Sequence, residues 1–364
     1  MHSRKADKLF LSIVIVLTSA GFFIWLSASL GLLARDGARF SSVAVSQIVF
    51  GILAGGVAMY FTSRVPYRFW RKHALKILLL SISLMFLVYI PGLGFSHNGA
   101  KRWIDLGFVS FQPAEFFKIA FVIYFSAWAS GFKEKVALFK YGLLPLLILL
   151  GIAGALLLSQ PDTDTLIIMG FAGIAIYLSA GGRWKSVFGL VLAGAGGVAV
   201  LAYSRTYVME RILTFLDPSR DPLGAGYQIQ QSIIAIGSGK IFGRGFGQSI
   251  QKFNYLPEPI GDSIFAVAAE EFGFVGSVLL IFLFVAFALR ALKIASRSPD
   301  LFGGLLALGI VILIVSESFI NIASMLGIVP LSGSPLLFVS HGGTALFFAL
   351  AEAGIILNIS RYQK

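Results

Sequence analysis

Long apolar segments alternate with short polar segments along almost the whole chain. The first apolar segment, 9–33, has about 25 residues, which is enough to cross a bilayer as a helix. It is too long for the apolar part of a signal peptide and has no clear cleavage site before its end, so we interpret it as a spanning helix. Further segments repeat the pattern. The ten predicted spans are 9–33, 43–62, 74–93, 116–130, 141–158, 165–180, 186–203, 263–288, 302–326 and 344–359.

The loops between these spans differ sharply in charge. Of the 29 Lys and Arg residues, 18 lie at the two termini or in loops on the same side of the membrane. The positive-inside rule makes this side cytoplasmic, and an even number of spans places both termini there. The longest outward loop, 204–262, connects the seventh and eighth spans. The other outward segments are 34–42, 94–115, 160–164 and 327–343.

Composition supports the same class of protein. Apolar residues make up 57% of the chain and charged residues 13%, and the mean hydropathy is +0.87. This leaves too little polar surface for a soluble globule, so we predict an all-α polytopic membrane protein. The sequence shows no internal repeat and no soluble domain. Residues 1–364 are therefore predicted to form a single membrane domain that includes the loop 204–262.

Charge and cysteine content exclude several other classes. A net charge of +12 would suggest a nucleic-acid partner in a soluble chain, but here the basic residues serve as topology signals. We predict no nucleic-acid binding. The chain has no cysteine, which excludes disulfides, thiolate metal ligands and cysteine nucleophiles.

Asp262 lies where a polar, proline-containing loop becomes an apolar helix, in the stretch KFNYLPEPIGDSIFAVAAEEFG. A carboxylate at the start of a membrane helix is costly unless it is paired or used, so Asp262 is a functional candidate. Its position fits a helix N-cap equally well. Helical spacing places Ala266, Ala269 and Gly273 on the face of Asp262. These small residues permit either tight helix packing or a cavity below the carboxylate, and because Asp262 lies on the outward side we interpret them as room for a substrate.

Other polar residues gather in the outward segments. Glu115 and Lys118 are three residues apart on one helix face, which suits either a structural ion pair or contact with a substrate. Asp162 and Asp164 lie in a turn that we predict to be solvated. Polar residues inside the last two spans are interpreted as interhelical hydrogen-bonding groups; they are Glu317, Asn321, Glu352 and Asn358.

The long outward loop has internal patterns of its own. Helices are predicted at 207–215 and 228–236, and the second has the pattern of a helix at a membrane interface. A glycine-rich run, 237–247, lacks the Gly-Lys-Ser/Thr ending of a nucleotide-binding loop. We interpret it as a bend that lets the backbone approach either a pyrophosphate or another helix.

The chain resembles one family at many separated positions. The blocks that carry the resemblance are NGAKRWIDLG, SFQPAEFFK, QPD, DPLGAGYQ, GQSIQKFNYLPEP, DSIFAVAAEEFG and PLLFVSHGG. They look like the signature blocks of the SEDS family, the bacterial shape, elongation, division and sporulation proteins, and occur in the same order over nearly the whole chain. GQSIQK before YLPEP is more similar to the FtsW and SpoVE members than to the RodA members.

The resemblance implies a peptidoglycan glycosyltransferase that polymerises lipid II into undecaprenyl-linked glycan, for cell division or cell-shape maintenance. It implies the outer face of the bacterial cytoplasmic (inner) membrane as the site of action. It also implies a class B penicillin-binding protein transpeptidase and other division or elongation complex proteins as partners. The family's essential loop aspartate falls on Asp262, and its fourth-span acid and base fall on Glu115 and Lys118. Departures from the family pattern, which bear on subfamily and substrate preference, are Gly261, Ala114, Asp164, Leu337 and His341.

The chemistry implied by the resemblance suits these residue types. Joining two lipid-linked sugars with inversion requires a base at the attacking 4-hydroxyl group, and a carboxylate can serve. The leaving lipid pyrophosphate requires positive charge rather than an acid. We therefore predict Asp262 as the base and Glu115 as the residue that orients Lys118. No organic cofactor is expected, and a divalent cation, Mg²⁺ or Mn²⁺, is left open. The basic residues predicted to bind substrate are Lys118, Arg102, Lys101 and Lys252.

Two functions of other classes remain open from the sequence. A flippase or transporter for the same lipid-linked precursor would also need a charged cavity within the membrane. A non-catalytic scaffold would only recruit a transpeptidase. Synthesis of glycan strands in detergent, where no transbilayer movement takes place, would require the enzyme.

Overall fold

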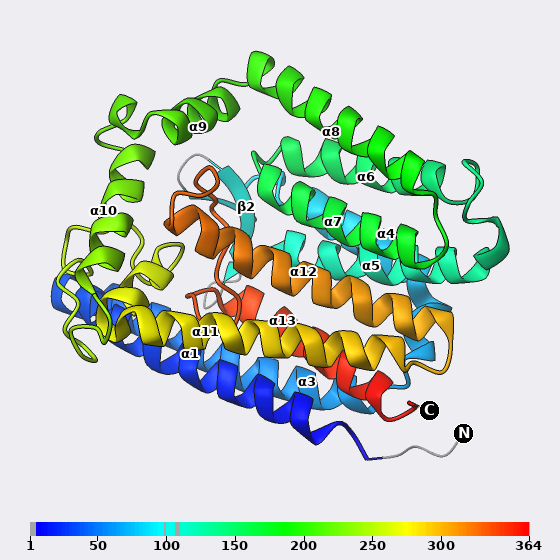
Figure 1. Cartoon of the computed structure of the whole chain (residues 1–364), viewed down its shortest axis with the longest axis horizontal. Coiled ribbons are helices and arrows are strands. Elements are labelled where there is room, and N and C mark those ends of the chain that lie inside the picture. Colours follow the sequence, from blue (N-terminus) through cyan, green and yellow to red (C-terminus); the bar gives the residue numbers. More distant parts are fainter. Residues whose placement is uncertain (1–4, 98–99, 106–109, 364) are drawn as a thin grey trace.

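The computed structural model describes residues 5–97, 100–105 and 110–363 and is predominantly helical. The long helices lie side by side in a bundle, with α1 along one side and α8 along the opposite side (Figure 1). The elements are α1 Lys8–Arg35, α2 Gly37–Val45, the π-helix η1 Ser46–Ala54, α3 Gly55–Arg64, α4 Arg68–Leu87, α5 Pro113–Gly131, η2 Lys133–Lys135, α6 Leu143–Leu158, α7 Thr163–Ser179, α8 Trp184–Ser204, α9 Thr206–Leu216, η3 Pro218–Arg220, α10 Ala225–Ser238, α11 Ile264–Ser296, α12 Leu301–Met325 and α13 Gly343–Ser360.

Every predicted span contains a helix in the structure. Among the described residues, 6 helices are long and apolar enough to cross a membrane: α1, the continuous stretch Gly37–Arg64, α8, α11, α12 and α13. The apolar helices α6 and α7 are shorter. These lengths make the chain a multi-pass membrane protein, whereas the number of ten spans stays a prediction.

Burial separates the helices at the centre of the bundle from those at its edge. α12 and α13 are mostly buried, and α5 packs against both α4 and α12. α8 is mostly exposed although it is apolar, with Phe188 and Val200 each 67% exposed. An exposed apolar helix is typical of a surface that faces lipid.

A small antiparallel sheet replaces part of the loop predicted at 94–115. Its strands are β1 Gly94–His97, β2 Ala100–Asp105 and β3 Ser110–Phe111, in the order β1-β2-β3. Gly94 and Phe111 both pair with Ile104 of the central strand. The all-α prediction is therefore wrong in this segment, where three short strands pair their backbone N–H and C=O groups with one another. The sheet fixes Arg102 on its middle strand.

The long segment 204–262 contains both helices predicted for it, as α9 and α10. α10 runs across the ends of the bundle helices (Figure 1). Asp221 shapes its entry, since its carboxylate accepts a hydrogen bond from the Ala225 backbone N–H at 2.7 Å. The helix then leads into the glycine-rich run.

α11 is broken near its beginning. Gly273 has φ 66° and ψ −163°, a conformation that is essentially restricted to glycine. The glycine-rich run supplies the backbone hydrogen bonds that the helix loses: Phe274 N–H donates to Lys240 O at 2.9 Å, and Arg244 N–H donates to Glu270 O at 3.0 Å. The run therefore docks on the break in α11.

The small face of α11 serves this docking. A Cβ at Gly273 would lie 2.3 Å from the backbone nitrogen of Gly243, and one at Gly239 would lie 2.0 Å from the Ala269 carbonyl oxygen. Of the two interpretations left open for the glycine-rich run, the structure shows approach to another helix. The small residues of α11 are used for tight packing rather than for a cavity below Asp262.

Candidate active site

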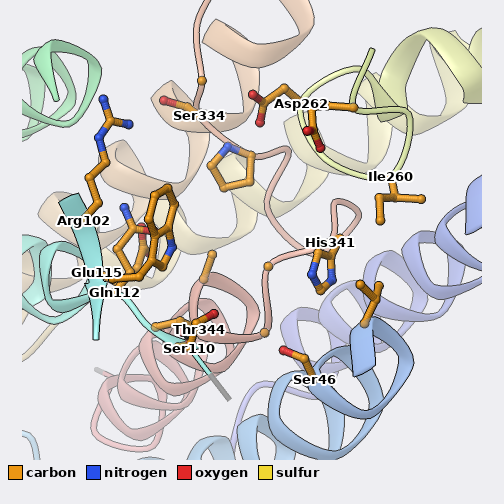
Figure 2. Close-up of a pocket in the computed structure, with 18 of the residues that line it drawn as sticks. Ser46, Arg102, Ser110, Gln112, Glu115, Ile260, Asp262, Ser334, His341 and Thr344 are labelled. Atoms are coloured by element: carbon orange, nitrogen blue, oxygen red, sulfur yellow. Dashed lines mark hydrogen bonds between the residues drawn. The ribbon is translucent and has the colours of Figure 1, made fainter. Parts of the chain in front are cut away.

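A cavity of about 430 Å³ lies where β2, the start of α11 and the loop before α13 meet. Arg102 and Glu115 lie on one side of it, and Asp262 and His341 lie on another (Figure 2). Acidic residues outnumber basic residues in its lining. The charged residues that line it are Arg39, Arg102, Glu115, Asp162, Glu258, Asp262 and Glu317.

Asp262 is partly exposed to this cavity, two residues before the start of α11. Its carboxylate accepts no hydrogen bond from the described residues, and the N-cap position of α11 belongs to Ser263. The carboxylate is therefore free for a ligand. Desolvation by its surroundings raises the pKa of Asp262 to about 7, and the nearby carboxylates of Glu258 and Asp164 act in the same direction.

The backbone around Asp262 is held by side chains from two other elements. The Asn321 amide of α12 donates to the carbonyl oxygens of Asp262 and Ser334, both at 2.8 Å. The Ser340 hydroxyl group donates to Gly261 O at 2.9 Å. Because these hydrogen bonds are made to backbone carbonyl oxygens, they fix the position of Asp262 and leave its carboxylate free.

The loop before α13 is fixed in turn by Gln47 of the π-helix. Its amide donates to Ser340 O at 3.2 Å and accepts from the Gly342 backbone N–H at 3.1 Å. The residue between them, His341, donates its backbone N–H to Ile260 O at 2.7 Å. Burial, followed by the positive charge of Arg39, lowers the pKa of His341 to about 4, so the ring is neutral at physiological pH.

Lys118 lies between two carboxylates at the floor of the cavity. Its Nζ atom is 3.0 Å from Glu115 Oε1 and 2.5 Å from Glu317 Oε2, and all three residues are at most 5% exposed. The ion pair between Glu115 and Lys118 is present, and Glu317 from α12 joins it. Both glutamates line the cavity, whereas Lys118 lies behind them.

Arg102 is held by the turn before α7. Its Nε donates to Gln160 O at 2.9 Å and its Nη2 donates to Pro161 O, while its Nη1 lies 4.0 Å from Asp162 Oδ1. Two of its five N–H donors are therefore used within the protein, and its charge faces the buried carboxylate of Asp162. Lys101, its neighbour on β2, is exposed and does not line the cavity.

The turn with Asp162 and Asp164 is not solvated, contrary to the prediction. Asp162 is 3% exposed and accepts the Thr165 backbone N–H at the start of α7, at 3.4 Å. Asp164 accepts from Arg211 of α9 at 3.2 Å and from the Gly333 backbone N–H at 3.1 Å. The turn is largely shielded from solvent because the segment 204–262 folds over it, which residue spacing does not reveal.

Lys252 lies in a different environment from the one predicted. Its ammonium group is fully buried, 2.7 Å from Glu271 Oε1 and 3.1 Å from Ser27 Oγ. It does not line the cavity of Asp262. The charge of Lys252, which we assigned to substrate binding, is thus neutralised by Glu271, and its ammonium group also donates a hydrogen bond to α1.

Three residues of the cavity were missed or given no role from the sequence. Glu317 was assigned to interhelical hydrogen bonding, although an acid in the middle of an apolar span is itself a functional signal. His341 was noted only as a departure from a family pattern. No pattern in the sequence around Arg39 indicates a functional role.

The described residues contain no group of three or more His, Asp or Glu side chains arranged to hold a metal ion. The acidic residues around the cavity do not converge on one point, so they do not fit a dedicated cation site. We derive no step through a divalent cation.

These features define a multi-pass membrane protein with a free, loop-held carboxylate in a charged cavity. The family model of cell cycle proteins that covers FtsW, RodA and SpoVE matches residues 7–364. The chain therefore belongs to this family.

Curated relatives match over most of their length. Stage V sporulation protein E of Bacillus subtilis is 39% identical over 318 residues, which is 87% of each chain. A probable peptidoglycan glycosyltransferase FtsW of Trichlorobacter lovleyi is 38% identical over 357 residues, covering 97% of this chain and 93% of the relative. The corresponding protein of Geobacter sp. strain M18 is 36% identical, covering 97% of this chain and 96% of the relative.

Solved structures share the fold. One chain, from work on the structural coordination of polymerization and crosslinking by a peptidoglycan synthase complex, superposes with a TM-score of 0.80 at 25% identity, with 99% of each chain covered. The rod shape determining protein RodA of Thermus thermophilus gives a TM-score of 0.70 at 24% identity, covering 99% of this chain and 98% of that chain.

Proposed function

We propose that this protein is a peptidoglycan glycosyltransferase that polymerises lipid II, in cell division or cell-shape maintenance. The single observation that carries the proposal is the free carboxylate of Asp262, held at a cavity by backbone hydrogen bonds on both sides of it. The names of the FtsW relatives support the same activity. Lipid II and undecaprenyl-linked glycan are its substrate and product.

We place the protein in the bacterial cytoplasmic (inner) membrane, with ten spans, both termini in the cytoplasm and the cavity facing outward. The distribution of basic residues supports this orientation. A class B penicillin-binding protein transpeptidase is the proposed partner, since the related chain of known structure comes from a complex that couples polymerization to crosslinking. Other division or elongation complex proteins would join them.

The proposed reaction is an inverting glycosyl transfer. The 4-hydroxyl oxygen of the acceptor sugar attacks C1 of the donor, and the O–C1 bond forms as the bond from C1 to the lipid diphosphate breaks. The bonding electron pair leaves with the diphosphate, and Asp262 accepts the hydroxyl proton. A pKa of about 7 suits this role, because a base works best when its pKa lies near the working pH.

Lys118 was predicted to bind the substrate, and we now assign it a different role. Because two carboxylates neutralise this lysine, we assign it to holding Glu115 and Glu317 at the cavity surface. There the two glutamates can accept hydrogen bonds from sugar hydroxyl groups. Arg102 shapes the opposite wall, and Lys252 holds the outward segment against α1 and α11.

Polymerisation by the purified protein tests the proposal. Lipid II in detergent is incubated with the protein, alone and co-purified with a class B transpeptidase, with and without Mg²⁺ or Mn²⁺. Glycan strands are expected in at least one of these conditions. A flippase or a scaffold would make no strands in detergent under any of them, and that result would refute the enzyme.

A further inference from the structure

The proposed reaction releases a lipid diphosphate, and the structure leaves few cations to receive it. The basic side chains predicted for this task are already paired: Lys118 with two glutamates, and Lys252 with Glu271. Arg102 is held by two backbone carbonyl groups and lies 4.0 Å from the buried carboxylate of Asp162. A diphosphate that gains negative charge must therefore be stabilised by another group.

The basic residues that line the cavity are Arg39 of α2 and Arg102, and of these two only Arg39 has no ion pair with the described residues. Its side chain is exposed, and its guanidinium group makes no hydrogen bond or ion pair with the described residues. Asp36, the nearest acid along the chain, is used as the N-cap of α2, where it accepts the Arg39 backbone N–H at 2.9 Å. The neutral His341 beside it adds no second charge.

A second cavity, of about 520 Å³, lies next to the first between the end of α1 and the loop 252–260. The two cavities share three lining residues, Arg39, Glu258 and Ile260. Arg39 thus borders the cavity that contains Asp262 and a second space large enough for another part of the substrate. A group bound where the two cavities meet would therefore contact Arg39 and lie next to the cavity that contains Asp262.

We propose that Arg39 binds the diphosphate group of the lipid-linked donor at the junction of the two cavities. This assignment rests on the proposed function and adds the residue that stabilises its leaving group. A guanidinium group donates two parallel hydrogen bonds to phosphate oxygens, and its charge balances the charge that develops as the C1–O bond breaks. The departing diphosphate then needs no proton from a general acid.

Binding of undecaprenyl diphosphate to the purified protein in detergent tests the assignment without requiring turnover. Arg39→Gln should weaken binding roughly 10- to 100-fold, the loss expected for hydrogen bonds to a charged group. Arg39→Lys should retain part of the affinity. The matched control is Arg205→Gln, because Arg205 is also exposed but lines neither cavity, and it should stay within about twofold of wild type.

Equal affinity of wild type and Arg39→Gln would overturn the assignment, as would equal losses in the Arg39 and Arg205 variants. Competition by phosphatidylglycerol as strong as that by the diphosphate would also overturn it, because Arg39 would then be a general contact for lipid phosphate. Polymerisation is measured in parallel. If wild type binds the diphosphate through Arg39 but makes no strands, the proposed enzyme fails while the diphosphate site stands.

Discussion

Replacing Lys118 by Met removes the cation between two buried carboxylates. Glu115 and Glu317 lie 3.0 and 2.5 Å from its Nζ atom and are 5% and 2% exposed, so the little water that reaches them from the cavity compensates only part of the lost charge. Breaking a buried ion pair by removing one partner costs about 3–5 kcal/mol in the free energy of unfolding. We expect a loss in this range for Lys118→Met.

A double-mutant cycle with Glu317→Gln resolves the pairwise interaction. Glu317→Gln alone leaves Lys118 paired with Glu115, and we expect it to cost about 1–3 kcal/mol. In the double variant only one buried carboxylate lacks a partner. The combined loss should therefore fall short of the sum of the single losses by about 1–3 kcal/mol, because the two residues are in contact.

Equilibrium unfolding in mixed detergent micelles gives the four free energies. Lys76→Met is the matched control, since Lys76 is exposed on α4, and it should change the free energy of unfolding by less than about 0.5 kcal/mol. Additive losses for Lys118 and Glu317, within about 0.5 kcal/mol, would refute the interaction on which this account of the cavity floor depends.

Three further results are expected. Gly273→Ala should destabilise the protein by about 2–4 kcal/mol in the same unfolding assay, because its Cβ would lie 2.3 Å from a backbone nitrogen at a positive φ; Gly194→Ala, with nothing within 4 Å, should not destabilise it. Asn321→Ala should lower kcat about tenfold or more while a conservative change at the exposed Asp217 does not, because the Asp262 backbone loses its donor. Polymerisation rates should fall as the pH falls through about 7, since Asp262 accepts a proton only when ionised; a rate unchanged well below that pH would contradict its role as base.

Local sequence patterns were sufficient where a residue and its role lie on one element. A helix forms in each predicted span, because apolar runs of that length favour helices in a membrane. The pair of Glu115 and Lys118 follows from helical spacing alone. Asp262 was visible as a carboxylate at the start of an apolar helix.

Features that depend on long-range packing could not be predicted in the same way. The partner of Lys252 is Glu271, and the contact forms only because the glycine-rich run docks on the break at Gly273. Asp164 is paired because Arg211 reaches it from α9, a helix that lies beyond α8 in the sequence. Arg39 becomes a candidate for binding substrate only when the structure shows that the other basic side chains are in ion pairs.

Polymerisation of lipid II by the Asp262→Asn variant tests the central claim most directly. The variant keeps the shape of the side chain but cannot accept the hydroxyl proton, so we expect the rate to fall about 10²- to 10⁴-fold. Thermal unfolding and co-purification with the transpeptidase should match wild type, and Asp217→Asn should polymerise normally because Asp217 is exposed. Glycan synthesis by Asp262→Asn at the wild-type rate would contradict the assignment of Asp262 as the catalytic base.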